Sequence, residues 1–543
     1  MNGNYRGGAI AGICLGSAML FAGSDFAGSK RELRFSVAGE PETFDALHVA
    51  EENSEVVRYL TGGVLVHVNP LTDRVEPELA ESWTLSDGGR AITFRLRAGL
   101  RFSDGASLTA TDVARTLNMA LDPKQAAPAG DPFRSERGNP DIRVVSAREI
   151  AIRYPQPKPD VDRLFDTFAI APLNRGANLG TLPPSAGPFY VAEYRPGDYV
   201  RLARNPHYWK RDPAGRQLPY LNSIRIDIQP NHDIELARFL RGETHLINKL
   251  SPENFDRVAK EMPGALRNPT VSLDSEFLWF NNAPSTAVPE WKRKWFASAT
   301  FRHAVSASIQ RDDIARIVYR GHAHPAAGSV SAANRFWFNS ALKPLPFDPQ
   351  SALRLLGAEG FTLRDSVLRD RDGHPVEFSL ITNAGNRQRE AMATVIQDDL
   401  RKMGIQVNIV TLDFGSLIER ISKSAQYEAC LLGLANVAID PAEQMNIWLS
   451  SGAQHAWWPS EKSPATPWEA QIDRFALLQA SEPSRDLRKK AFDQVQRIAV
   501  EQEPILYLVN PDHLVAISPS LKSVQPVAAP PQILWNIEWL HFD

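Results

Sequence analysis

The chain has 543 residues, which is too many for a single hydrophobic core and predicts two to four lobes. Hydrophobic residues make up 43% of it and charged residues 23%, as in ordinary soluble globular proteins. The formal net charge of −3 argues against a nucleic-acid-binding protein and against attachment to membranes through a basic surface.

Residues 1–29 have the features of an export signal peptide. Arg6 precedes an uncharged segment, 7–24, whose apolar run is shorter than the ~20 residues that a membrane-spanning helix needs. Small residues at 22–24 offer a cleavage region. The alternative is an interfacial anchor that is retained. We therefore expect export to the periplasm or the extracellular space. The remaining cysteine, Cys430, fits a small buried apolar residue.

The first structural element after this segment is a strand. Leu33, Phe35 and Val37 alternate with polar residues, which is the pattern of a strand with one buried face. The turn GEPETFDAL follows and contains Glu40 and Phe44.

The segment 78–123 gives the clearest local prediction. Apolar residues alternate with polar ones at 92–96, and Asp-Gly turns flank this strand. Thr109 and Asp112 then form a capping pair at the start of a helix with one apolar face. We expect two strands, a turn and a capped helix here, without catalytic residues.

The second half of the chain is typical of an α/β domain. Strands are expected at 376–381, 405–412 and 427–433, and helices near 387–403 and 416–422 separate them. Alternation of strands and helices predicts parallel strands joined by crossover helices in an open, twisted sheet.

The order of these elements closely resembles family 5 of the extracellular solute-binding proteins. The resemblance is carried by 78–123 and by the stretch GPFYVAEYRPGDYVRLARNPHYWK at 187–210. Members of this family are receptors of ABC importers for peptides, opines and nickel. The resemblance implies an α/β fold of the type II periplasmic-binding-protein kind, with two α/β lobes about a hinge and an inserted third lobe.

The resemblance also implies how the chain divides into lobes. A discontinuous lobe I would comprise 30–72, 185–272 and 505–543. An inserted lobe II would comprise 73–184, and lobe III would comprise 273–504. The solute would lie in the cleft between lobes, and closure about the hinge would signal to a membrane permease.

The implied partners are a small peptide-like or related solute and an ABC permease, with no nucleic acid, cofactor or metal, and the chain is expected to be a monomer. The residues expected to contact the solute, by their match to the family pattern, are Glu40, Phe44, Asn383, Gly433, Leu434, Ala435, Asn436 and Val437.

Two positions depart from the pattern of the dipeptide-binding members. Those members place an Asp at the position of Val437, where it pairs with the peptide's amino terminus, and an Arg at the position of Asn383. Valine cannot compensate a buried ammonium group. Arg387 and Arg389 lie close to Asn383 in sequence, and an alignment shifted by a few residues would place an Arg at this position, so the departure at Asn383 is the weaker of the two. These departures favour longer, blocked or modified peptides, glycosides or other solutes. Asp440 is interpreted as a helix cap rather than a solute contact.

Other chemistry receives little support from the sequence. The chain after the leader contains no nucleophile-elbow, zinc-protease or phosphate-loop motif, so we expect no enzymatic activity. His322 and His324 are interpreted as loop residues rather than metal ligands, and the His455–Trp458 segment as a packed loop rather than a stacking site for a ligand. The alternatives to a transport receptor are a secreted hydrolase on the same scaffold and a chaperone-like binder of extended segments.

Overall fold

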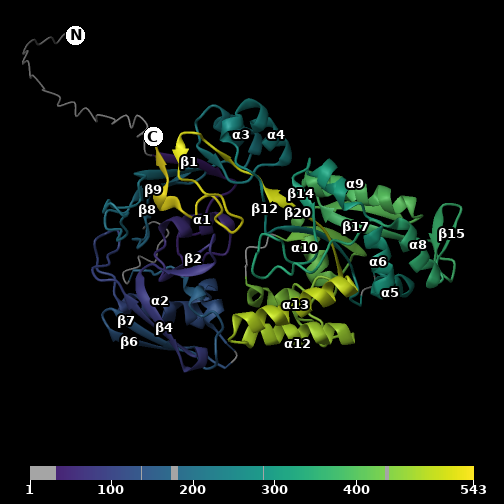
Figure 1. Ribbon diagram of the computed structural model, residues 1–543, viewed down its shortest axis with the longest axis horizontal. Helices are drawn as coiled ribbons and strands as arrows, with labels where there is room; N and C mark the ends of the chain where they lie inside the picture. Colours follow the sequence, from purple (N-terminus) through teal and green to yellow (C-terminus); the bar gives the residue numbers. More distant parts are fainter. Residues whose placement is uncertain (1–31, 136, 173–181, 285–286, 435–439) are drawn as a thin grey trace, which may run out of the picture.

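The computed structural model describes residues 32–135, 137–172, 182–284, 287–434 and 440–543 (Figure 1). In this part of the chain, each of three large sheets forms the centre of a lobe with its own hydrophobic core. The first and second lobes lie on one side of the molecule in Figure 1, and the third lies on the other. The expected mixed α/β architecture with three lobes is confirmed.

The first lobe is assembled from strands that are distant in sequence. Its sheet has the strand order β21-β11-β1-β10-β9-β8. The bounds are β1 Glu32–Val37, β8 Phe189–Arg195, β9 Tyr199–Arg204, β10 Ser223–Ile228, β11 Leu246–Ile247 and β21 Ala516–Ile517. Strand β1 pairs in parallel with β10 and β11, and Leu33 and Phe35 point into the core, as their alternation predicted.

The second lobe contains the segment with the clearest local prediction. Its antiparallel sheet has the order β4-β5-β7-β6, with β4 Ala80–Ser86, β5 Ala91–Leu96, β6 Asp141–Ser146 and β7 Glu149–Arg153. Helix α2 (Ala110–Leu121) packs on this core. Its Asp112 carboxylate accepts hydrogen bonds from the backbone N–H of Thr109 at 2.8 Å and from its hydroxyl at 2.9 Å, so the predicted cap is confirmed.

The third lobe contains the parallel strands predicted in the second half of the chain. Its main path is β12-β20-β13-β19-β17-β18, and β14 pairs with β20. The bounds are β12 Thr270–Val271, β13 Ser275–Phe280, β14 Ala323–Pro325, β17 Glu377–Asn383, β18 Gln406–Leu412, β19 Ala429–Leu434 and β20 Ile505–His513. Strand β17 is parallel to both β18 and β19.

The expected lobe boundary at residue 505 is wrong for strand β20. This strand pairs antiparallel with β13, and its Tyr507 contacts Phe277 of β13. Residues 505–513 therefore complete the sheet of the third lobe, and the chain returns to the first lobe at β21. The reason is that pairing with β13 buries both faces of the apolar strand β20. The order of the elements along the chain does not reveal this pairing.

Helices cover these sheets, and short ribbons extend from them. The helices are α1 Glu52–Thr61, α3 His232–Leu240, α4 Pro252–Glu261, α5 Glu290–Ala297, α6 Ala299–Ala307, α7 Arg311–Asp313, α8 Pro349–Ala358, α9 Arg387–Lys402, α10 Phe414–Glu419, α11 Met445–Trp448, α12 Pro467–Ser481 and α13 Arg485–Gln502. The two-stranded ribbons pair β2 Val66–Asn69 with β3 Arg74–Pro77, β15 Thr362–Arg364 with β16 Val367–Arg369, and β22 Leu521–Lys522 with β23 His541–Phe542.

Ion pairs connect the second and third lobes at the start of α13, which lies beside the second lobe in Figure 1. Arg485 contacts Asp73 at 2.7 Å, and the buried Arg488 contacts both Asp160 and Asp440. Asp440 also accepts a hydrogen bond from the backbone N–H of Ala442 at 2.8 Å, which supports its interpretation as a cap. The cap and the ion pair both use the Asp440 carboxylate to fix the segment where the two lobes meet.

Candidate functional site

Two of the sequence-predicted solute contacts meet at one edge of the third sheet. Asn383 ends β17, and Gly433 is the second-last residue of the parallel strand β19. Carboxyl ends of parallel strands share an edge, and ligands commonly bind there. Helix α9, which follows β17, brings Arg389 between them: its Nη1 donates a hydrogen bond to Asn383 Oδ1 at 2.9 Å.

The side chain that pairs with Arg389 is Glu276 of strand β13. Arg389 Nε donates to Glu276 Oε2 at 2.9 Å, and Nη2 donates to Oε1 at 3.3 Å. The two side chains are only 14% and 12% exposed. This two-pronged contact is the arrangement in which a guanidinium group binds a carboxylate most specifically.

Gly433 provides the space that this ion pair occupies. It lies opposite Glu276 in the β13–β19 register. A Cβ atom at Gly433 would lie 2.5 Å from Arg389 Nη2 and 2.6 Å from Glu276 Oε1. Both distances are shorter than van der Waals contact, so the ion pair can lie across β19 only because residue 433 has no side chain.

Burial dominates the electrostatics of this cluster. It raises the pKa of the Glu276 carboxyl, and the positive charge of Arg389 and its hydrogen bonds oppose that shift. Lys249, which follows β11 of the first lobe, also favours the ionised carboxylate. Burial, together with the negative charge of Glu276, raises the pKa of the nearby Tyr319 well above its usual value. The tyrosine is therefore a neutral hydroxyl at physiological pH.

Sequence reasoning missed Glu276, and it considered Arg389 only as an arginine that a shifted alignment would place at the position of Asn383. The available signal was a single acidic residue in the strand SEFLWF, every residue of which is buried. A carboxylate in such a strand requires a partner of opposite charge. That signal could identify Glu276, but not the partner, which lies 113 residues away.

The other predicted solute contacts have separate positions. Glu40 is exposed and accepts a hydrogen bond from the Tyr194 hydroxyl at 2.8 Å, while Phe44 packs edge-on against the same tyrosine with ring centroids 5.1 Å apart. Among the described residues, no hydrogen bond, ion pair or ring contact joins either one to the cluster around Arg389. Leu434 packs against the core beneath the third sheet. Ala435, Asn436 and Val437 lie outside the described residues.

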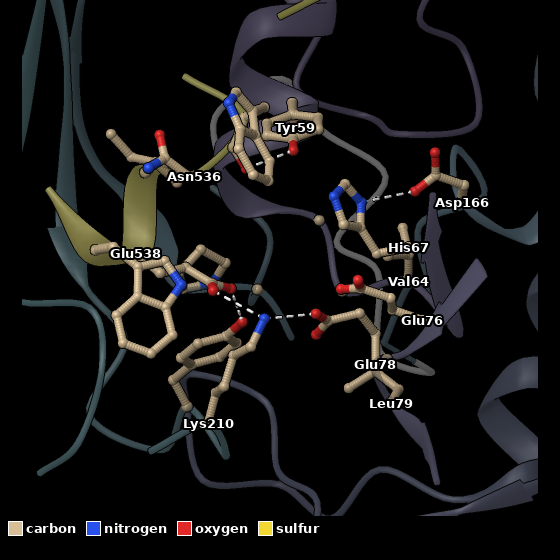
Figure 2. Close-up of a pocket in the computed structure, with 18 of the residues that line it drawn as sticks. Tyr59, Val64, His67, Glu76, Glu78, Leu79, Asp166, Lys210, Asn536 and Glu538 are labelled. Atoms are coloured by element: carbon tan, nitrogen blue, oxygen red, sulfur yellow. Dashed lines mark hydrogen bonds and ion pairs between the residues drawn. The ribbon is translucent and has the colours of Figure 1, made fainter. Parts of the chain in front are cut away.

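A second candidate is a pocket of about 510 Å³ between the first and second lobes (Figure 2). Its walls come from α1, the β2–β3 ribbon, the segment 208–210 and the C-terminal segment 535–539. None of the sequence-predicted contacts lines it. Figure 2 shows Lys210 between two carboxylates, Glu78 at 2.6 Å and Glu538 at 2.9 Å.

Lys210 and His67 of this pocket are paired with acidic residues that also line it. Burial lowers the pKa of Lys210, but the charges of Glu538 and Glu78 outweigh burial and the pKa is raised. His67 Nδ1 lies 3.0 Å from Asp166 Oδ1, and this contact raises the histidine pKa despite its burial. Lys210 thus connects the start of the inserted lobe to the C-terminal segment, which is a structural role at the junction of two lobes.

The remaining histidine candidates have acidic neighbours. His322 Nε2 lies 3.8 Å from Asp256 Oδ1, and His324 Nε2 lies 3.0 Å from Asp512 Oδ1. In the described part of the chain they do not belong to a common group of metal-ligand atoms. His322 lies outside helices and strands, as expected, but His324 lies in strand β14 and pairs with Asn510 of β20, so its interpretation as a loop residue is wrong. No helix of that part is both long and apolar enough to cross a membrane.

Comparisons with known proteins place the chain among solute-binding proteins. The model of the family "Bacterial extracellular solute-binding proteins, family 5 Middle" matches residues 74–456. A probable ABC transporter-binding protein of Deinococcus radiodurans is 27% identical over 504 residues, covering 85% of this chain and 84% of the relative. The oligopeptide-binding protein AppA of Bacillus subtilis is 24% identical, with 92% of this chain and 90% of the relative covered.

A solved structure of the same fold is that of NikA from Brucella suis in complex with Fe(III)-EDTA. It has a TM-score of 0.79 and 22% identity, and the alignment covers 94% of this chain and 100% of the other. The agreement confirms the expected fold of the type II periplasmic binding proteins.

Proposed function

Because the chain belongs to family 5 of the bacterial extracellular solute-binding proteins, we propose that it captures a peptide-like solute and delivers it to the permease of an ABC importer. Relatives named as oligopeptide-binding and di/tripeptide-binding proteins support a peptide-like solute. Binding and lobe closure need no covalent chemistry, and the closed state is the signal to the permease.

The observation that carries the proposal is the polar cluster at the edge of the third sheet. Arg389 is fixed by Glu276 and in turn fixes the orientation of Asn383. The Asn383 carboxamide, with its oxygen on Arg389, directs its NH₂ group as a donor toward a solute carbonyl. A pre-oriented donor at a half-buried edge suits the backbone of a peptide, whose groups need hydrogen-bond partners once lobe closure excludes water.

Glu276 and Arg389 refine the predicted specificity. The position matched to the family's Asp carries Val437, but Glu276 supplies a carboxylate close to Gly433. Since Arg389 already neutralises that carboxylate, a free ammonium group gains less from it than from an unpaired one. We therefore favour a solute without a buried terminal ammonium group, such as a blocked or longer peptide. Glu40, Phe44, Leu434 and residues 435–437 remain predicted contacts.

Export precedes this function. Residues 1–29 are proposed to direct the chain across the membrane, so that capture takes place in the periplasm or outside the cell. The proposed unit is one chain with one solute, which then docks on its permease.

The test is to identify and then titrate the solute. Mass spectrometry of small molecules released from the purified chain names candidates, and calorimetry with synthetic peptides measures their affinity. We expect Asn383→Ala to weaken binding about tenfold, because one hydrogen bond to a buried group is lost. The matched control is Arg401→Gln, an exposed ion-pair residue at the other end of α9, which should leave the affinity unchanged.

Other outcomes select the alternatives. Sustained turnover of peptides would indicate the hydrolase, and weak binding to many unrelated extended chains would indicate the chaperone-like protein. Tight binding of a solute that Asn383→Ala leaves unaltered would remove the third-sheet edge as the site.

A further inference from the structure

A second cluster of buried ionisable side chains lies in the third lobe, on elements other than those around Asn383. It comprises His455 and Glu461, in the loop between α11 and α12, and Glu469 in the first turn of α12. One ligand atom from each lies within 4.8 Å of the other two. The three residues are 1%, 4% and 3% exposed.

The imidazole of His455 has a defined tautomer. Its Nδ1 lies 3.0 Å from the backbone carbonyl oxygen of Ile447, which can only accept a hydrogen bond. The proton therefore resides on Nδ1, and Nε2 presents a lone pair. Nε2 has no hydrogen-bond partner among the described residues. A carbonyl on one ring nitrogen with the other nitrogen left unpaired is the arrangement of metal-binding histidines.

The two carboxylates differ in their partners. Glu469 Oε1 accepts a hydrogen bond from Trp457 Nε1 at 2.8 Å, and Oε2 accepts one from the Thr466 hydroxyl at 2.7 Å. Glu461 Oε2 is buried without a partner in the described part of the chain. Glu469 is thus held in place like an oriented ligand, and Glu461 has an oxygen available.

The surrounding charges leave this cluster uncompensated. Burial, then the negative charges of Glu469 and Asp473, raise the pKa of Glu461 to about 7. Burial lowers the pKa of His455, so the imidazole is neutral. Arg302 interacts with the charge of Glu469, but its guanidinium donates its hydrogen bonds to backbone carbonyl oxygens. His455 Nε2 and Glu461 Oε2 are buried without a partner among the described residues, so either a proton or a bound cation must compensate the two carboxylates.

We propose that His455 Nε2, Glu461 and Glu469 bind a divalent transition-metal ion of the zinc type. One imidazole and two carboxylates form a ligand set suited to such ions. Ligand atoms about 2.0–2.2 Å from a tetrahedral zinc ion lie roughly 3.3–3.6 Å from one another, so these three atoms, which lie within 4.8 Å of one another, must move closer when the ion binds. The fourth position would hold water. The ion would link the loop between α11 and α12 to helix α12. Its role would be to stabilise the fold of the third lobe, and it would not contact the solute.

The chain supplies a matched control. Asp370, Asp372 and His374 also gather metal-ligand atoms, but Asp372 is exposed and the other two are only half-buried. His374 Nδ1 already contacts Asp370 Oδ2 at 3.0 Å. The side chains of this second group therefore already contact each other within a turn, and we expect the group to bind no metal ion tightly.

The experiment uses the full chain stripped with EDTA and then titrated with Zn²⁺. Elemental analysis after desalting should find a single tightly held zinc per chain, and calorimetry gives the affinity. His455→Gln and Glu461→Gln should each weaken zinc binding at least about tenfold, whereas His374→Gln should not. Co²⁺ is a second probe: its visible absorption should change in Glu461→Gln, which a merely structural role of this residue would not cause.

Three results would overturn the proposal. The first is that the chain holds no stoichiometric zinc and Zn²⁺ does not alter its melting temperature. The second is that only His374→Gln loses zinc binding, and the third is that His455→Gln and Glu461→Gln both keep the zinc affinity of the native chain. Loss in Asn383→Ala alone would assign the metal to the solute site instead. Glu461→Gln keeps the size of the side chain, and near-ultraviolet circular dichroism in EDTA checks that the variant is folded.

Discussion

Two groups of buried charges in the third lobe are balanced in different ways. Glu276 contacts a guanidinium group of opposite charge, whereas Glu461 lies beside a second carboxylate and a neutral imidazole. The protein compensates the first group by itself. The second requires a proton or an added cation, because burying an unpaired charge is costly. Burial alone therefore does not reveal whether the charges of a cluster are compensated. The pairing of the charged groups with one another does.

Breaking the compensated pair should have the largest effect. Arg389→Met leaves the Glu276 carboxylate buried without its partner, and we expect the free energy of unfolding to fall by about 3–5 kcal/mol. Urea denaturation measures it. The double variant Glu276→Leu/Arg389→Met should recover most of the loss, since two apolar side chains can replace a buried ion pair. A double variant as unstable as the sum of the two single variants would contradict this explanation.

The uncompensated group should show itself in the pH dependence of stability. The pKa of Glu461 is raised from its ordinary 4.5 to about 7, so the folded state holds this proton more tightly than the unfolded state. In EDTA this residue therefore contributes about 3 kcal/mol of stability below pH 4.5, and that contribution is lost as the pH rises through about 7. Thermal melts of the native chain and of Glu461→Gln isolate the contribution by difference.

Zinc should reverse this trend. Metal binding needs the ionised carboxylate, so with Zn²⁺ present the stability of the native chain should rise over the same pH range. Glu443, whose pKa burial also raises to about 7, contributes equally to both proteins and cancels in the difference. If the stability of the native chain and of Glu461→Gln depended on pH in the same way, the group around Glu461 would not be an uncompensated one, and it would not differ from the Glu276–Arg389 pair in this respect.

A smaller effect is expected where the backbone makes room for the compensated pair. Gly433→Ala places a methyl group 2.5 Å from Arg389 Nη2, and we expect a loss of about 1–3 kcal/mol with weaker solute binding. Gly357→Ala is the control, since a Cβ there meets nothing within 4 Å and alanine favours a helix. Denaturation of both variants checks this, and equal effects would argue against a role for the space at Gly433.

The smallest effect on stability should come from the group formed by Asp370, Asp372 and His374. His374→Gln removes the contact with Asp370, which is partly open to solvent, and should change the free energy of unfolding by less than about 1 kcal/mol. If His374→Gln lowered the free energy of unfolding as much as Arg389→Met does, solvent exposure would not explain the difference in stability contribution between the two clusters.

The sequence predicted those features that depend on neighbouring residues. The strand at Ala91–Leu96, the Thr109–Asp112 cap and the parallel order of β17, β18 and β19 all follow from local periodicity, capping and alternation. The family resemblance, confirmed by the match over residues 74–456, came from the order of such local elements. Asn383 and Gly433 were placed by that resemblance, and their proximity follows from parallel strands sharing an edge.

Only the tertiary structure decided which distant groups meet. It paired Glu276 with Arg389 across 113 residues, added β20 to the third sheet, and gathered His455, Glu461 and Glu469 around one point. The physical reason is that charge compensation and strand pairing depend on distance in space. Local patterns fix which residues must be buried, but the partner that a buried charge finds, or lacks, is set by the packing of the whole lobe.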